Sequence, residues 1–191
     1  ALNAYAAWLK ANPLLWPARI GLLGVFAVHV WLGISLAREN RAARPQRYRD
    51  GLALPLSSAA SRSMILTGLV VLAFVAFHLA HFTFGAVQPD AYALVDEQGR
   101  HDVYGMVMAG FRNPWIVGTY VVAMLLLGVH LAHAAQSLLQ TLGVRYEHGN
   151  HLVQNLSLAI VAGIILGNLT LPLSVFLGFV ASPEGAAVAA H

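Results

Sequence analysis

Cysteine is absent from this 191-residue chain, and charged residues make up only 10% of it. Without cysteine, the chain cannot form disulfides, covalent c-type haem attachments, or thiolate-ligated iron–sulfur and zinc sites. Because 58% of its residues are hydrophobic, it also has too little polar material to coat a water-soluble globule of this size. The composition therefore predicts a membrane protein, in which any metal would be bound by histidine or oxygen.

Four long segments contain no Asp, Glu, Lys or Arg: residues 20–37, 63–86, 114–144 and 152–182. A bilayer core about 30 Å thick requires roughly 20 apolar residues for each helical crossing. We therefore predict an all-α integral membrane protein, with residues 1–191 forming one bundle of four transmembrane helices. Their expected limits are about 14–38, 61–86, 114–142 and 151–180. Apolar residues at helical spacing in 2–12 predict an additional short helix lying on the membrane interface.

The connections between these segments differ in charge. Residues 38–62 hold six arginines against two acidic residues, whereas 87–113 hold four acidic residues against two arginines. The positive-inside rule then places 38–62 in the cytoplasm and both chain ends outside. This topology accounts for the net charge of +3, so no nucleic-acid partner is expected.

Five histidines lie inside the apolar segments: His29, His78, His81, His130 and His133. Ionisable residues are costly in lipid and usually serve a function there. A proton relay or transporter site usually adds Asp or Glu, which these segments lack. Neutral imidazole carries no charge to bury and suits axial ligation of haem. The alternative for each histidine is a hydrogen bond between helices. The remaining histidines, in loops and tail, are expected to be solvated.

Depth in the membrane indicates which histidines can meet. With a helical rise of 1.5 Å per residue, His29 lies roughly 14 Å from Arg38, and His130 lies roughly 20 Å from Gly143. These two histidines are therefore predicted to share one haem. His78 lies roughly 24 Å beyond Arg62, near the opposite surface, and has no good partner in this chain.

Further residues are candidates for contacts at the cofactor edges. His81 and His133 each follow a deeper histidine by three positions and could bond a haem propionate or line a quinone pocket, although a hydrogen bond between helices is favoured for both. Arg62 is a candidate for the propionates of an inner haem, and Arg19 and Arg112 for those of an outer one. For the three arginines, the alternative is a role in topology and snorkelling.

An ordered set of segments resembles a known family. LNAYAAWLK, PLLWPARIGLL, VHVWLG, SRSMILTG, FHLAHFTFG, HDVYGMVMAGFRNP and GVHLAHAAQSLLQTLG follow one another along the chain. Together they resemble the single-chain, five-helix dihaem cytochrome b anchor subunit of bacterial succinate dehydrogenases and fumarate reductases. The resemblance covers nearly the whole chain.

The resemblance implies two b-type haems, ligated by pairs of helices: the first with the third and the second with the fourth. By motif, His29, His78 and His130 match the ligands of the second, third and fourth helices. One haem would then lie between His29 and His130. The other would need His78 and a histidine of the first helix, which this sequence lacks. We expect the sequence to be part of a longer chain; a helix from another chain is the alternative.

The resemblance also implies partners and a location. A flavoprotein subunit and an iron–sulfur subunit would dock on the cytoplasmic face of a bacterial cytoplasmic membrane. Electrons would pass between them and a quinone, expected to be menaquinone, through this multi-pass subunit. The subunit is not expected to be an enzyme alone. Both a single complex and a trimer of complexes fit. Certain fumarate reductases carry a proton-moving glutamate two residues before the fourth-helix ligand; here that position is Gly128.

Two other functions are compatible with the residues. The first is the cytochrome b subunit of a formate dehydrogenase or a hydrogenase, which also uses membrane histidines. The second is a haem-free membrane scaffold or transporter, in which the histidines only hold helices together.

Overall fold

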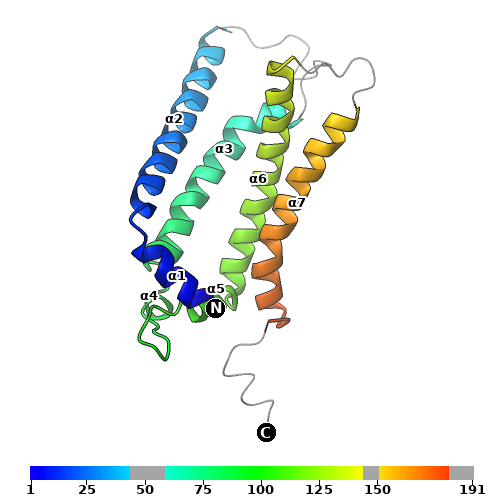
Figure 1. Cartoon of the computed structure of the whole chain (residues 1–191). Helices are drawn as coiled ribbons and strands as arrows, with labels where there is room; N and C mark the ends of the chain where they lie inside the picture. Colours follow the sequence, from blue (N-terminus) through cyan, green and yellow to red (C-terminus); the bar gives the residue numbers. More distant parts are fainter. Residues whose placement is uncertain (44–58, 144–150, 181–191) are drawn as a thin grey trace.

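The computed structural model describes residues 1–43, 59–143 and 151–180. Within these ranges the chain is helical and contains no strand. Four helices are long and apolar enough to cross a membrane, which confirms the predicted all-α bundle (Figure 1). They are α2 (Leu15–Ala42), α3 with its extension (Ala59–Thr83), α6 (Pro114–Thr141) and α7 (His151–Phe176).

The helix limits differ from the expected ones mainly at the C-terminal ends. Helix α2 continues four residues past the expected residue 38 to Ala42, so its charged last turn remains helical. Helix α7 stops at Phe176 rather than near 180. Gly178 there has a φ of 77°, and the N–H of Phe179 bonds back to the carbonyl of Ser174. A glycine in this left-handed conformation is a common helix stop.

Helices α3, α6 and α7 form the packed part of the bundle, with α6 in the middle. Buried apolar side chains lie along α6 in two clusters. One is near its start and joins α5 (Val103–Phe111), and the second lies between α6 and α7. Gly128 of α6 permits this close approach, because a Cβ atom there would lie 3.2 Å from Ile165 of α7. Helix α2 has no buried residue and packs mainly beside α3 (Figure 1).

A short π-helical segment, η1 (Leu79–Thr83), follows directly after α3 (Ala59–His78). The N–H of Phe84 bonds to the carbonyl of Leu79, five residues earlier, which widens the last turn. Such segments are rare and occur frequently at functional sites. This one contains His81 and begins immediately after His78.

The connection from η1 to α6 contains two short helices, α4 (Pro89–Tyr92) and α5. The N-terminal helix α1 (Leu2–Ala11) packs against α5. The side-chain amide of Asn3 donates to the carboxylate of Asp102 at 2.8 Å, and its oxygen accepts from the N–H of Tyr104 at 2.9 Å. The start of the chain is thereby held at one end of the bundle.

Candidate site of the membrane histidines

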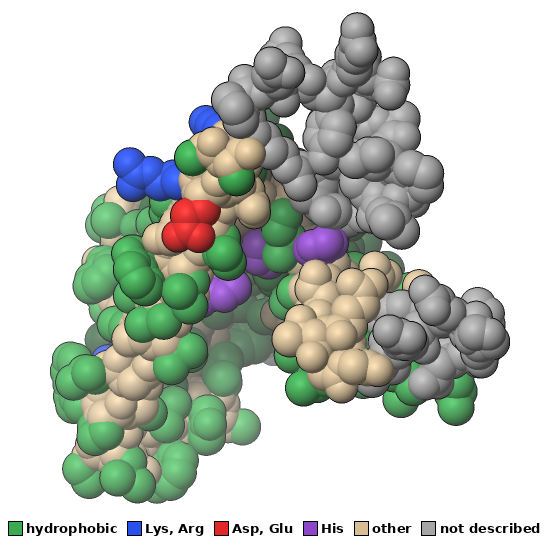
Figure 2. Space-filling view, turned by 90° about the horizontal axis from the view of Figure 1, so that it is seen from above, with side chains coloured by type: hydrophobic (Ala, Val, Ile, Leu, Met, Phe, Trp, Pro, Cys, Tyr) green, Lys and Arg blue, Asp and Glu red, His purple; other side chains and the backbone are tan. Residues whose placement is uncertain are grey.

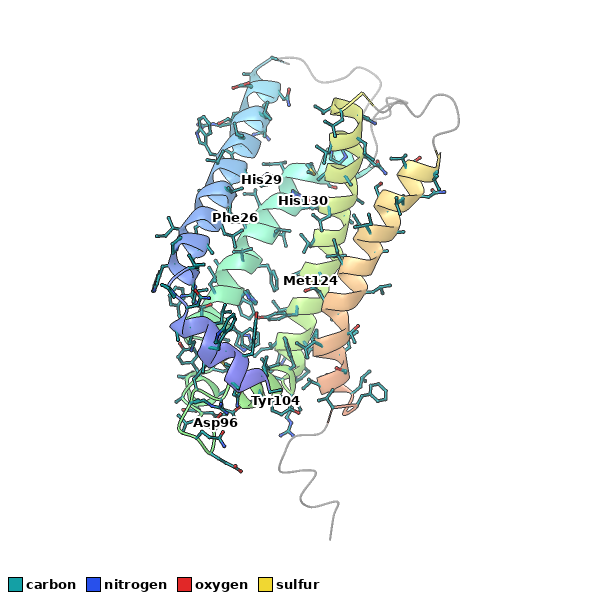
Figure 3. All side chains as sticks on the ribbon, viewed as in Figure 1. Phe26, His29, Asp96, Tyr104, Met124 and His130 are labelled. Atoms are coloured by element: carbon teal, nitrogen blue, oxygen red, sulfur yellow. The ribbon has the colours of Figure 1, made fainter. Side chains whose placement is uncertain are left out.

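His29 and His130 project toward each other from α2 and α6 (Figure 3). Their ring centres are 6.2 Å apart, and the ring planes make an angle of 83°. The sequence predicted that these two side chains would lie at matching depth, and the structure brings them together. His29 is exposed on the surface of the described chain, and His130 is half-buried.

The two rings line a cavity of about 660 Å³ between α2, α3 and α6. This volume lies within the range of roughly 300–1,000 Å³ typical of cofactor and small-molecule sites. Seen from the end at which α2 finishes, histidine side chains lie in a hollow between the helices (Figure 2). Most of the wall is apolar and includes Phe26, Val30, Ile34, Ile65, Leu69 and Leu72.

One part of the cavity wall is polar. Asn40, His133 and Ser137 line it and come from the C-terminal parts of α2 and α6. The Nε2 atom of His133 lies 3.5 Å from the hydroxyl of Ser137, one turn further along α6. His133 therefore faces the cavity, as the sequence allowed, and contributes a polar end to an otherwise apolar space.

The hydroxyl of Thr67 is the hydrogen-bond partner of the His130 ring. Its hydroxyl lies 3.1 Å and 3.0 Å from the backbone carbonyls of Ser63 and Met64, to which it can only donate. The same oxygen lies 3.3 Å from Nδ1 of His130. When the single hydroxyl proton is donated to one of these carbonyls, the oxygen accepts from Nδ1–H of His130. The lone pair of His130 is then on Nε2, the other ring nitrogen.

Gly68 makes room for the His130 ring beside α3. A Cβ atom at this glycine would lie 3.2 Å from Cε1 of His130, closer than an ordinary van der Waals contact. Sequence reasoning missed both Gly68 and Thr67, because threonine and glycine are common in membrane helices for packing alone. The sequence offered one indication only: both residues lie in the helix between those that carry the two histidines of matching depth.

The spacing of the His29 and His130 rings fits an iron bound between them. Metal–imidazole nitrogen bonds are about 2 Å long, so two rings on opposite sides of one metal have centres roughly 6 Å apart. The observed 6.2 Å agrees with this value. The described residues contain no group of three or more His, Asp or Glu side chains suited to a metal ion. The two imidazoles and the cavity that they line are therefore the part of the described chain that could hold a metal-containing cofactor.

His78 belongs to a second group, on α3 and near the opposite end of the bundle. Its Nδ1 lies 3.2 Å from the hydroxyl of Tyr120 on α6, and its ring also contacts those of Phe74 and Phe82. The second histidine expected to share a haem with His78 stays a prediction. His81 also contacts Tyr120, with Nδ1 at 3.1 Å from the hydroxyl, while its Nε2 lies 3.0 Å from Oε1 of Gln88.

Both ring nitrogens of His81 thus have partners, and its side chain is only 1% exposed. His81 is therefore a hydrogen-bonding residue between helices, the alternative that the sequence favoured over a direct contact with a cofactor. Sequence reasoning missed Tyr120 and Gln88. Aromatic residues are common in membrane helices, so Tyr120 carried no distinct signal, and Gln88 lies in a connection whose path the sequence does not define.

The candidate arginines lie away from the cavity where the structure describes them. The guanidinium of Arg19 lies 5.3 Å from the ring centre of Trp16, and exposed Arg112 forms the C-cap of α5. Neither residue lines the cavity of His29 and His130. Both were predicted for an outer haem, so the choice between a propionate contact and snorkelling stays a prediction. The backbone of Arg62 belongs to α3, but its side chain is outside the described part of the chain.

His101, the histidine outside the spans whose side chain the structure describes, takes no part in either group. His101 packs on Tyr92, with ring centres 4.9 Å apart. Partial burial lowers its pKa, and the positive charge of Lys10 lowers it further. His148 and His191 lie outside the described residues, as does the side chain of His151.

Comparison of the chain with protein-family models, with curated proteins and with solved structures found no match in any of the three.

Proposed function

We propose that the chain is a haem-b-carrying, quinone-reactive membrane anchor of a succinate dehydrogenase or fumarate reductase. The observation that carries the proposal is the His29–His130 pair, with ring centres 6.2 Å apart beside a cavity between three membrane helices. The two imidazoles and the apolar wall suit a flat, largely apolar cofactor. The ordered sequence segments that resemble dihaem anchors narrow the choice to this class.

In this proposal His29 and His130 hold one haem, which would supply one-electron transfer within the membrane. Thr67 keeps the Nε2 lone pair of His130 available by accepting from Nδ1–H. The apolar wall excludes water and lowers the local dielectric. Asn40, His133 and Ser137 form the polar part of the wall and suit carboxylate groups at the cofactor edge.

His78 would ligate the second haem, together with a histidine supplied from outside these 191 residues. The flavoprotein and iron–sulfur subunits would dock at the end where α2 finishes, because the arginine-rich connection lies there by sequence. That end would be cytoplasmic in a bacterial cytoplasmic membrane. Menaquinone is the quinone we expect.

A reduced-minus-oxidised visible spectrum of the purified, intact complex tests the proposal. We expect b-type absorption from two centres. His29→Ala and His130→Ala should each remove the same centre, because each variant deletes one of its two axial ligands, whereas His78→Ala should remove the other. His101→Ala, outside the spans, is the matched control and should retain both.

Two results would contradict parts of the proposal. If the intact complex shows no b-type absorption, the histidines only hold helices together, as in a haem-free scaffold or transporter. If loss of His29 and loss of His130 deplete different centres, the pairing is wrong. The copurifying soluble subunits separate the proposed complex from a formate dehydrogenase or a hydrogenase.

A further inference from the structure

A continuous line of hydrogen bonds leads from the α4 region to His78. Gln88 lies next to His81 at 3.0 Å, His81 next to Tyr120 at 3.1 Å, and Tyr120 next to His78 at 3.2 Å. The line crosses from the N-cap of α4 to η1, then to α6, and ends on α3. Three elements, α3, η1 and α6, therefore meet at one tyrosine hydroxyl.

The direction of the protons along this line is set at its Gln88 end. Oε1 of Gln88 can only accept, so Nε2 of His81 carries a proton and donates it. Nδ1 of the neutral His81 ring is then unprotonated and accepts from the hydroxyl of Tyr120. Because that hydroxyl proton points to His81, the tyrosine oxygen accepts from Nδ1–H of His78.

We propose that Gln88, His81 and Tyr120 are positioning residues that hold His78 in the tautomer with a proton on Nδ1 and a free lone pair on Nε2, ready to ligate iron. This inference rests on the proposed function, in which His78 is a haem ligand. Metal-binding histidines almost always donate their second ring N–H to a fixed acceptor, which sets the tautomer and ring orientation. Here that acceptor is oriented by two further residues.

Aromatic packing holds the side chains of this hydrogen-bonded line in place. Tyr120 is 6% exposed, and its ring makes edge contacts with Phe74, Phe82 and Phe111. Gly110 of α5 leaves space for the far end, because a Cβ atom there would lie 3.1 Å from Nε2 of His81 and 3.4 Å from Oε1 of Gln88. The His81 ring also stacks on Phe82, with centres 3.9 Å apart. These contacts fix the tyrosine ring, and with it the position of the hydroxyl oxygen.

The reduction potential of the His78 haem tests this inference. A hydrogen bond from Nδ1–H to an oxygen makes the imidazole a stronger donor and favours the oxidised iron, so losing the bond should raise the potential. In the intact complex, Tyr120→Phe keeps the ring and its aromatic contacts but removes the acceptor. We expect a rise equivalent to about a tenfold change in the ratio of oxidised to reduced haem, or ~59 mV for one electron.

Assignment and control come from two further variants. The His130→Ala complex should retain the His78 haem alone, so its titration identifies which potential belongs to His78. Tyr92→Phe is the matched control, because the hydroxyl of Tyr92 bonds to the backbone carbonyl of Thr83 and does not belong to the line. It should leave both potentials unchanged.

Substitutions of Gln88 test the direction in which protons are donated along the line, and they leave Tyr120 and its aromatic neighbours unaltered. Gln88→Leu removes the acceptor that orients His81 and should raise the potential of the same haem by a smaller amount. Gln88→Glu keeps an acceptor and should stay at or below the potential of the unaltered complex. If Gln88→Glu raises the potential as much as Gln88→Leu does, the direction is wrong.

The outcomes for the inference and for the proposed function are separate. If the unaltered complex contains no b-type haem, the proposed function fails. If both haems are present but Tyr120→Phe shifts the His78 potential no more than Tyr92→Phe does, the proposed function stands and this inference is overturned. A shift confined to the haem of His29 and His130 would overturn it as well.

Discussion

Among the described residues, two polar side chains are almost completely buried: Thr67, 4% exposed, and His81, 1% exposed. Buried polar groups are generally hydrogen-bonded, because leaving one unpaired costs about 1–3 kcal/mol. Thr67 bonds His130 directly, and His81 bonds the tyrosine that contacts His78. Both buried polar residues thus serve a proposed haem ligand, one near each end of the bundle.

Thr67→Val should weaken haem binding at the His29–His130 pair. Valine has nearly the shape of threonine but leaves Nδ1–H of His130 without its acceptor, and loss of such a partner typically costs 10–100-fold in metal affinity. The rate of haem transfer to an excess of apomyoglobin measures the effect. Thr67→Ser retains the hydroxyl and should behave like the unaltered protein. Equal transfer rates for the valine and serine variants would exclude the role of the hydroxyl.

Gly68→Ala should disturb the same haem through a steric contact. The new Cβ would lie 3.2 Å from Cε1 of His130, so the ring must shift by a few tenths of an ångström. Gly118→Ala is the matched control on α6, since its Cβ meets nothing within 4 Å. Alanine favours both helices by about 1 kcal/mol, so thermal stability should not fall. We expect a changed absorption spectrum for Gly68→Ala alone, and an identical spectrum in both variants would contradict the steric role of Gly68.

At the residue scale, the sequence predicted the His29–His130 pair because helical rise converts sequence distance into depth. It could not predict Thr67, Gly68 or Tyr120 as their partners, since depth does not define how each helix is rotated. Rotation is fixed by packing between helices, which the sequence pattern encodes weakly when a helix is apolar on every side.

At the scale of elements, the long helices were predictable because lipid requires about 20 apolar residues with all backbone groups bonded inside the segment. The short helices α4 and α5 and the π-turn η1 were not predicted individually. The π-turn brings His81 onto Tyr120, and this contact lies between residues 39 positions apart in sequence. A local sequence pattern cannot predict a contact between residues so far apart in the chain.

The turn between α4 and α5 should be sensitive to acid. Arg100 bonds the carboxylate of Asp96 at 2.9 Å through Nε, which lowers the pKa of Asp96 to about 2. Because the folded pKa lies below the ordinary value of 3.8, this contribution is present above pH 4 or so and is lost as the pH falls through about 2.

Amide hydrogen exchange at Gln98 and Arg100, whose N–H groups both bond to Asp96, reports on this turn. We expect protection of these two amides at pH 5 and its loss near pH 2. Arg100→Gln should shift the loss to higher pH, toward the ordinary carboxyl value. Protection that does not change with pH in both proteins would contradict the assigned cause.

At the scale of the whole molecule, α2 is joined to the other helices chiefly along α3 and across the cavity. Under the proposed function, the cofactor then supplies part of the contact that holds α2 in place. In complexes depleted of haem, hydrogen exchange across Leu15–Ala42 should increase severalfold, whereas α7, which packs directly on α6, should change little. A uniform increase over both helices would indicate general destabilisation instead.

The extra turn of α2 beyond residue 38 has a consequence for recognition. Arg38 and Arg41 are carried on a helix and not on an irregular connection, so their backbone is already ordered before any partner arrives. Ordering of interface segments is a main cost of association, and a surface that is rigid in advance avoids it. A soluble protein approaching this end would therefore meet positive charges at defined spacing. The same short stretch of helix would both attract that protein and orient it.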